Sequence, residues 1–273
     1  MNKLKEHNKK SLMLILLYSL FMSKTFAIET QEVTILADDG YPPYSFIETG
    51  EVKGIYVDIV KEAGKLLAPH YKVTIVAYPW KRALHEIKKG TAFAIIPPYQ
   101  HIKVRPYIWP YSVQIIKEEV IAFCNKDINL LEHMNAKTTE HNPPIRIGVN
   151  AGYLILNEEL EQARKENKII IAENKSTKSN IMKLYARRVD CYLNDKYSTY
   201  NELSKMQKET KISFDNIKEA FLVMIQTGHI GYTDASTHTF LFKDDFILRM
   251  DEALSQVISS NTYQNIIDSY TAK

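Results

Sequence analysis

Arg105 and Asp195 are the charged residues whose surroundings best suit the binding of a small polar molecule. Arg105 lies in KVRPYIWPYS, among prolines and aromatic residues. Its guanidinium can donate two parallel, charge-assisted hydrogen bonds to a carboxylate. Asp195 follows a predicted strand, and a carboxylate at the carboxyl end of a strand can neutralise a cation in a cleft. Both also have structural interpretations, as a surface arginine beside a proline-rich loop and as the N-cap of a helix.

Aromatic residues gather in one turn near the start of the chain. Tyr44 and Phe46 lie beside a proline pair whose fixed φ angles hold the turn at little entropic cost. They follow a predicted strand, Gln31–Ala37, and precede a predicted helix that begins near Ile55. Rigid rings at the carboxyl end of a strand suit the binding of a small molecule. The alternative is that these rings cover the edge of the core.

A second element with aromatic and basic residues is Pro79-Trp80-Lys81-Arg82, after the second predicted strand. Trp80 is placed to stack on a ligand, and Arg82 to offer a second contact to an anion. Core packing of Trp80 beneath a surface Arg82 is equally compatible with the sequence. Tyr99 could also line a cleft, although aromatic residues beside prolines often only pack within loops.

Strand and helix signals alternate along the chain, which indicates an α/β class with mostly parallel sheets. The alternation runs through two cycles, separated by the polar segment Asn125–Pro144. Apolar residues at helical spacing follow the second cycle, from Phe246 to Tyr270. The predicted strands after the first are Tyr71–Ala77, Ala92–Ile96, Glu118–Cys124, Arg146–Asn150, Lys168–Ala172, Val189–Leu193 and Ala220–Ile225, and further predicted helices are Lys81–Lys89, Ile155–Lys165 and Lys178–Ala186.

The first 27 residues have the composition of an export signal. Four lysines precede an apolar stretch, Ser11–Met22, that is too short to span a bilayer. Thr25-Phe26-Ala27 places small residues at the recognition positions, so we expect cleavage after Ala27. No cysteine stands directly after the apolar stretch, where one would carry a lipid anchor. We therefore expect an exported, soluble mature protein, most simply in a periplasm.

Removal of this signal also removes the apparent basicity of the chain. The signal holds five of the 35 Lys and Arg and one of the 32 Asp and Glu, which leaves 30 against 31. A net charge near −1 gives no reason to expect nucleic acid or an anionic membrane as a partner.

Several motifs together resemble the family 3 periplasmic solute-binding proteins, which serve ABC transporters for polar amino acids. The N-terminal signature of that family is matched by Pro42-Pro43-Tyr44, by Gly50 and by Gly54-Ile55-Tyr56-Val57-Asp58. Ser112 follows Arg105 by seven residues, which is the family interval, and Tyr111 stands in the aromatic position. The resemblance covers nearly all of the mature chain. It implies that Arg105 clamps the α-carboxylate of a ligand and that Asp195 holds its ammonium group.

The resemblance also implies a bilobal fold, the type II periplasmic-binding-protein architecture, with two α/β lobes joined by a two-strand hinge. Lobe 1 would be discontinuous, with residues 28–119 and 232–273, and lobe 2 would be inserted, with residues 120–231. Hinge crossings are expected near Lys117–Val120 and Gly228–Tyr232.

Some positions depart from the amino-acid-binding pattern of the family. A threonine is usual three residues before the arginine, where this chain has Ile102, and an aspartate is usual where it has Phe93. Hydroxyl residues usually follow the lobe 2 glycine, whereas here Tyr153 and Leu154 follow Gly152. These departures weaken the assignment of an amino-acid ligand but leave the prediction of a binding protein unchanged. The expected ligand-binding residues are Tyr44, Phe46, Trp80, Arg82, Pro98, Tyr99, Arg105, Gly152, Tyr153 and Asp195.

Cys124 and Cys191 are the two cysteines of the chain. In an oxidising compartment an isolated pair favours a disulfide, and the alternative is two buried free thiols. The family arrangement implies that they lie on neighbouring antiparallel strands, close enough to bridge.

The sequence therefore predicts a monomeric, non-catalytic protein that closes around a small polar ligand, an amino acid or related carboxylate, for ABC-type uptake. We expect no metal and no cofactor, and an ABC permease or a membrane sensor as the partner. A dehydratase-like enzyme is the main alternative, and Glu118 or Asp195 would then supply its general acid or base.

Overall fold

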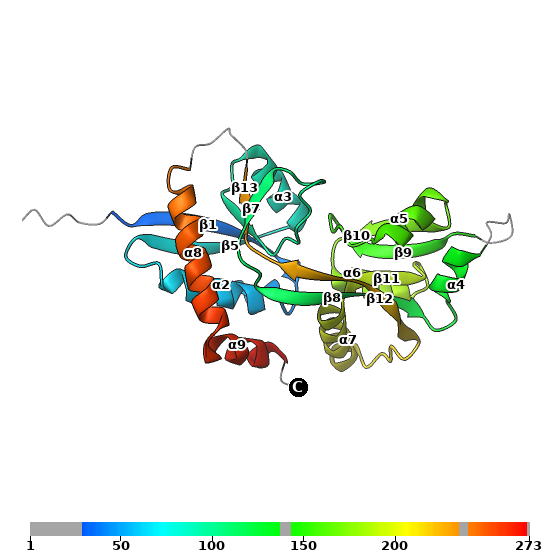
Figure 1. Ribbon diagram of the computed structural model, residues 1–273. Coiled ribbons are helices and arrows are strands. Elements are labelled where there is room, and N and C mark those ends of the chain that lie inside the picture. The colour runs from blue at the N-terminus through cyan, green and yellow to red at the C-terminus, as the bar shows by residue number, and fades with distance from the viewer. Residues whose placement is uncertain (1–28, 137–142, 235–239, 272–273) are drawn as a thin grey trace, which may run out of the picture.

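The computed structural model describes residues 29–136, 143–234 and 240–271, which form two α/β lobes side by side (Figure 1). The predicted export signal, residues 1–27, lies outside the described residues. Within the described ranges, no helix combines the length and the apolar character needed to cross a membrane.

Lobe 1 is built on a five-stranded sheet with the order β5-β1-β6-β13-β7. Strand β1 pairs in parallel with β5 from Gln31↔Tyr71 onward, and its inner face buries Val33 and Ile35. Packed against this sheet are helices from both ends of the chain (Figure 1). The elements are β1 (Gln31–Asp38), β2 (Gly40–Tyr41), β3 (Ser45–Glu48), β4 (Glu51–Lys53), α2 (Ile55–Lys65), β5 (Tyr71–Tyr78), α3 (Trp80–Lys89), β6 (Ala94–Ile96), β7 (Ile108–Tyr111), β13 (Gly231–Thr233), α8 (Lys243–Ile258) and α9 (Asn261–Thr271).

The turn before α2 fixes the aromatic residues predicted from the sequence. Gly54 has a φ of 128°, and a Cβ there would overlap the carbonyl oxygen of Tyr44. Only glycine fits such a conformation and such a close approach. The amide of Tyr56 donates to that carbonyl at 3.0 Å, so the start of α2 is tied directly to the aromatic turn. Tyr44 and Tyr56 are both buried in the lobe 1 core.

Lobe 2 has a second five-stranded sheet, with the order β10-β9-β11-β8-β12. Helices α5 and α6 begin with asparagine and serine N-caps, and the apolar faces of both pack toward the sheet. The elements are β8 (Ile116–Asn125), α4 (Leu130–Asn135), β9 (Ile145–Asn150), α5 (Glu158–Lys165), β10 (Ile169–Asn174), α6 (Thr177–Tyr185), β11 (Cys191–Asp195), α7 (Lys196–Thr210) and β12 (Ile217–Gly228).

The α/β class and the bilobal architecture agree with the sequence prediction, but the sheets are not mostly parallel. In lobe 1, β13 runs antiparallel to both β6 and β7. In lobe 2, β8 runs antiparallel to both β11 and β12. Each sheet therefore has two parallel and two antiparallel pairs, because one strand in each, β13 in lobe 1 and β8 in lobe 2, runs against the direction set by the βαβ units.

Strands β8 and β12 carry the chain between the lobes (Figure 1). They pair antiparallel along their full length, from Ile116↔Gly228 to Asn125↔Ile217. We propose the lobe boundaries expected from the sequence, 119/120 and 231/232, with one adjustment. Gly231 pairs with Ile95 in the lobe 1 sheet, so it belongs to lobe 1.

The predicted disulfide between Cys124 and Cys191 is confirmed. The two residues face each other directly across β8 and β11, and their Cα atoms are 4.0 Å apart. The bond ties the strand that enters lobe 2 to the central strand of its sheet.

Removal of this bond should destabilise the protein. Replacing both cysteines with alanine is expected to lower the free energy of unfolding by about 2–4 kcal/mol, because the bond closes a separation of 67 residues in the unfolded chain. Urea unfolding followed by circular dichroism, with and without reductant, measures this. Equal stability of oxidised wild type and the double variant would contradict a structural role.

Candidate functional site

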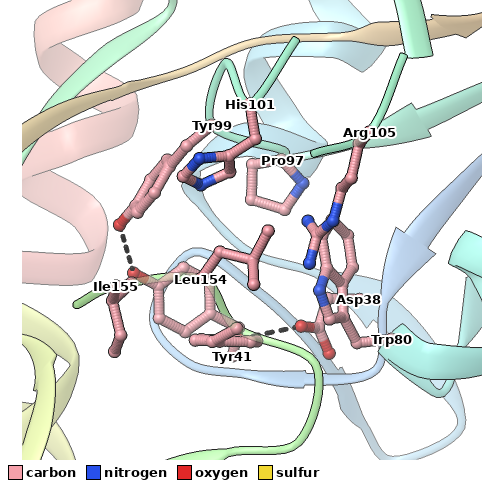
Figure 2. Close-up of a pocket in the computed structure, with 10 residues that line it drawn as sticks. Asp38, Tyr41, Trp80, Pro97, Tyr99, His101, Arg105, Leu154 and Ile155 are labelled. Atoms are coloured by element: carbon pink, nitrogen blue, oxygen red, sulfur yellow. Dashed lines mark hydrogen bonds between the residues drawn. The ribbon is translucent and has the colours of Figure 1, made fainter. Parts of the chain in front are cut away.

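A cavity of about 340 Å³, including its open mouth, lies between the two lobes. In the view of Figure 2, Arg105, Asp38 and Trp80 lie on the right of this cavity, and Tyr99 and His101 lie on its left. The lobe 1 residues around it are Asp38, Tyr41, Trp80, Pro97, Tyr99, His101 and Arg105, and the lobe 2 residues are Tyr153, Leu154 and Ile155. Both lobes therefore form its wall, which is the arrangement of a site that closes around a small molecule.

Arg105 lies on the loop between β6 and β7 and is 6% exposed. Its Nη2 atom donates to the carbonyl oxygen of Gly152 in lobe 2. Within the described residues, no carboxylate forms an ion pair with it, and burial lowers the pKa of the guanidinium. A buried guanidinium that faces only a backbone carbonyl can take up an anionic group with a gain in electrostatic energy.

Asp38 ends strand β1 and is 4% exposed. Its Oδ1 atom accepts a hydrogen bond from the amide of Gly40 at 2.9 Å, and its Oδ2 atom accepts one from the hydroxyl of Tyr153 at 2.9 Å. Burial raises the pKa of Asp38 to about 7, against the opposing effect of these two hydrogen bonds. Asp38 is therefore a titratable acceptor in the same cavity as Arg105.

Aromatic rings form much of the remaining wall. The ring of Tyr153 stands edge-on to Tyr41, with centroids 5.6 Å apart, and to Trp80, with centroids 6.2 Å apart. The indole Nε1 of Trp80 is buried without a hydrogen-bond partner among the described residues. A donor of this kind gains by meeting an acceptor on a bound molecule. His101 is a further polar group of the wall, and burial together with the nearby Arg105 charge lowers its pKa to about 4.

A buried carboxylate lies behind the cavity, on the hinge strand β8. Glu118 is 1% exposed and accepts hydrogen bonds from the hydroxyls of Tyr41, Tyr56 and Tyr99, the last at 2.7 Å. Burial raises its pKa, and the three hydroxyls oppose that effect. Tyr41 and Tyr99 also line the cavity, so their rings stand between it and Glu118.

Asp195 acts as the N-cap of α7, which was one of the two interpretations from the sequence. Its Oδ1 atom accepts a hydrogen bond from the amide of Ser198 at 2.7 Å. Burial, with the neighbouring charge of Glu118, raises its pKa well above the usual value, while a hydrogen bond from Tyr44 opposes the shift. Asp195 is 3% exposed and lies behind the cavity rather than on its wall.

The structure thus brings four of the expected residues together at the cavity wall: Trp80, Tyr99, Arg105 and Tyr153. Gly152 contacts Arg105, and Tyr44 contacts Asp195 behind the wall. Three others lie elsewhere. Phe46 packs edge-on against Tyr270, Arg82 is exposed and lies over the ring of Tyr78, and Pro98 is buried with its carbonyl accepting the amide of His229.

Asp38, Tyr41 and His101 line the cavity, although they were not among the residues predicted from the sequence to bind ligand. Asp38 and Tyr41 lie close in sequence to Tyr44, and Asp38-Asp39-Gly40 has the composition of a turn. The signal that could have identified Asp38 is its position as the last residue of a buried strand, where side chains reach a cleft. The departures at Ile102 and Phe93 are structural, since Ile102 is 47% exposed and Phe93 packs in the lobe 1 core.

Asp38 should make stability depend on pH. Its folded pKa of about 7 lies above the ordinary value, so the folded state holds the proton more tightly than the unfolded state. Stability from this group is full below about pH 4 and is lost as pH rises to about 7. Through this group, wild type should lose at most about 4 kcal/mol of unfolding free energy between about pH 4 and about pH 7, and Asp38→Asn should not show this loss. Chemical denaturation at pH 4, 5, 6 and 7 measures the difference.

The matched control is Asp215→Asn, because Asp215 is exposed in lobe 2. It should keep the wild-type pH dependence. Parallel stability curves for wild type and Asp38→Asn would show that the Asp38 carboxyl does not retain its proton in the folded protein.

Solved structures with this fold span several kinds of protein. A histidine kinase sensor domain with similarity to periplasmic binding proteins matches with a TM-score of 0.68 and 14% identity, over 89% of this chain and 97% of that chain. The ancestral amino acid-binding protein AncCDT-1, a precursor of cyclohexadienyl dehydratase, matches at 0.64 and 16%, over 88% and 95%. An amino acid ABC transporter substrate-binding protein from Streptococcus pneumoniae, bound to L-arginine, matches at 0.63 and 13%, over 88% and 94%. At these identities the likeness shows the fold alone.

A search of curated proteins finds no match. The family comparison is more specific, because the model of the bacterial extracellular solute-binding proteins, family 3, matches residues 33–273. The match begins two residues into β1 and runs through both lobes and the two C-terminal helices. This chain therefore belongs to the bacterial extracellular solute-binding proteins, family 3.

Proposed function

We propose that this protein binds a small solute with a carboxylate group and closes its two lobes around it. The observation that carries the proposal is the buried guanidinium of Arg105, which faces a cavity made by both lobes and, among the described residues, donates to the carbonyl of Gly152 and to no carboxylate. A carboxylate in that position would form two charge-assisted hydrogen bonds in place of one bond to a neutral acceptor.

Asp38 extends the proposal to a ligand with a positively charged end. It is buried at the same cavity, and its partner across the cleft is the neutral hydroxyl of Tyr153. An ammonium group there would contact the carboxylate and the rings of Tyr41 and Trp80. An amino acid carries both ends. Asp195 and Tyr44 would then support the site from behind the wall, and a longer ligand could reach them.

The coupling of binding to closure suits delivery to a membrane partner. We propose that the mature protein is exported after cleavage behind Ala27, acts as a monomer in a periplasm and presents its closed form to an ABC permease. A membrane sensor is the alternative partner, because a sensor uses the same closing cleft. Solved structures of both kinds share the fold.

A dehydratase-like activity is the second candidate function, and Asp38 is the observation that favours it. A cavity carboxyl whose pKa is raised to about 7 suits general acid or base catalysis. Glu118 and Asp195 suit it less, because neither lines the cavity. We expect no turnover of a cyclohexadienyl carboxylate in a spectrophotometric assay. Turnover that Asp38→Asn abolishes would favour the enzyme.

Arg105→Ala should abolish tight binding. A thermal-shift screen of amino acids, small carboxylates and short peptides identifies a solute, and calorimetry then compares variants. Loss of the buried anchor is expected to weaken binding about 30-fold or more. Arg82→Ala is the matched control, because Arg82 is exposed outside the cavity, and it should keep wild-type affinity. A solute without an acidic group that binds Arg105→Ala as tightly as wild type would contradict the proposal.

A further inference from the structure

Successive residues of one lobe 2 loop contact the polar groups of the lobe 1 cavity wall. This loop follows β9, and its residues 152–154 form what we name the inner segment. The carbonyl of Gly152 accepts a hydrogen bond from Arg105, and the hydroxyl of Tyr153 donates one to Asp38 at 2.9 Å. Both groups that we propose as ligand anchors are therefore bonded to the protein's own chain.

The same segment supplies the apolar contacts of the cavity. The Tyr153 ring lies edge-on between Tyr41 and Trp80, and it packs against the hydrophobic cores of both lobes. The backbone of the next residue, Leu154, hydrogen-bonds the imidazole of His101. The inner segment therefore contacts both polar and aromatic groups of lobe 1.

Close backbone packing seats the inner segment on helix α3. Gly152 has a φ of 83°, a left-handed conformation that favours glycine. A Cβ at this position would lie 3.0 Å from Cγ of Lys81 and 3.4 Å from Cδ1 of Trp80. The amide of Gly152 also contacts Glu173, which forms an ion pair with Lys81. The segment is fitted to lobe 1 by its backbone as well as by the tyrosine.

We propose that the inner segment is an internal ligand, which occupies the anchors of the cleft in the closed protein and must be displaced by a solute. Tyr153 then decides both whether the solute-free protein closes and which solutes can compete. The identity of Arg105 and Asp38 as solute anchors rests on the proposed function. The closure of the solute-free protein on its own segment does not.

The polarity of the segment matches that of a zwitterion. A carbonyl offers an acceptor to the guanidinium, as a carboxylate would, and a hydroxyl offers a donor to Asp38, as an ammonium group would. Bonds between two charged groups are stronger than these bonds, in which one partner is neutral. A solute that replaces both contacts can displace the segment, whereas one that replaces a single contact competes poorly. The apparent affinity for a solute is then the intrinsic affinity multiplied by the fraction of protein in which the inner segment does not occupy the site.

Small-angle X-ray scattering of solute-free, full-length mature protein tests the closure directly. Wild type should have a compact radius of gyration, and Tyr153→Ala should have a larger one. Tyr185→Ala is the matched control for loss of a tyrosine, because Tyr185 is 44% exposed on α6 of lobe 2. This control should remain compact. An open solute-free wild type, or a Tyr153→Ala variant as compact as wild type, overturns the proposal.

Tyr153→Phe keeps the ring and folds even if the alanine variant does not. With any of the twenty L-amino acids that binds wild type as the probe, calorimetry should show about ten-fold tighter binding to Tyr153→Phe, because no hydroxyl–carboxylate bond has to be broken. Unchanged or weaker binding overturns the proposal. If no amino acid binds, the proposed amino-acid ligand fails, and the scattering comparison still decides whether the segment closes the cleft.

Discussion

Arg105 places a permanent positive charge in a cavity where its side chain is 6% exposed. A buried guanidinium has to keep its donors bonded, and here the bond crosses the cleft to a backbone carbonyl of lobe 2. The lobes are therefore joined through the group that is best suited to hold a ligand. The contact holds the inner segment of lobe 2 against the lobe 1 side of the cavity.

The hinge strand β8 holds a second buried ionisable group, and its hydrogen-bond partners are side chains rather than a backbone carbonyl. Glu118 on β8 receives three tyrosine hydroxyls, two of them from residues that line the cavity. Gly228 on β12 pairs with Ile116, and a side chain there would overlap the hydroxyl of Tyr56. Lobe 1 side chains thus surround the Glu118 carboxyl at the base of the cleft. Their hydrogen bonds connect the aromatic wall of the cavity to the hinge strand.

Much of the fold could be predicted from the sequence. Alternating strand and helix signals identify both lobes, and the glycine turn before α2 and the opposed cysteines behave as expected. Helix α7 was not predicted, because Lys196–Thr210 is polar and carries a weak apolar face. The antiparallel strands were missed for a different reason, since strand direction depends on where the chain returns between the lobes and not on local pattern.

The site was harder to predict, because spacing along the chain does not show which residues face the cavity. The motif around Arg105 is local and places that residue at the cavity, whereas Tyr44 and Phe46 of the aromatic turn do not line it. Asp195 was expected at the ligand, yet its carboxylate caps α7 and does not line the cavity. Asp38 was overlooked, because two adjacent aspartates before a glycine have the composition of a turn, and only burial distinguishes the first from the second.

The central claim is that the cleft holds a carboxylate on Arg105. A crystal structure of the mature protein with the solute that most raises its melting temperature tests this most directly. We predict that a carboxylate of the solute lies within hydrogen-bond distance of the Arg105 guanidinium, in place of the Gly152 carbonyl. A solute bound elsewhere, with the bond between Arg105 and Gly152 intact, would contradict the account.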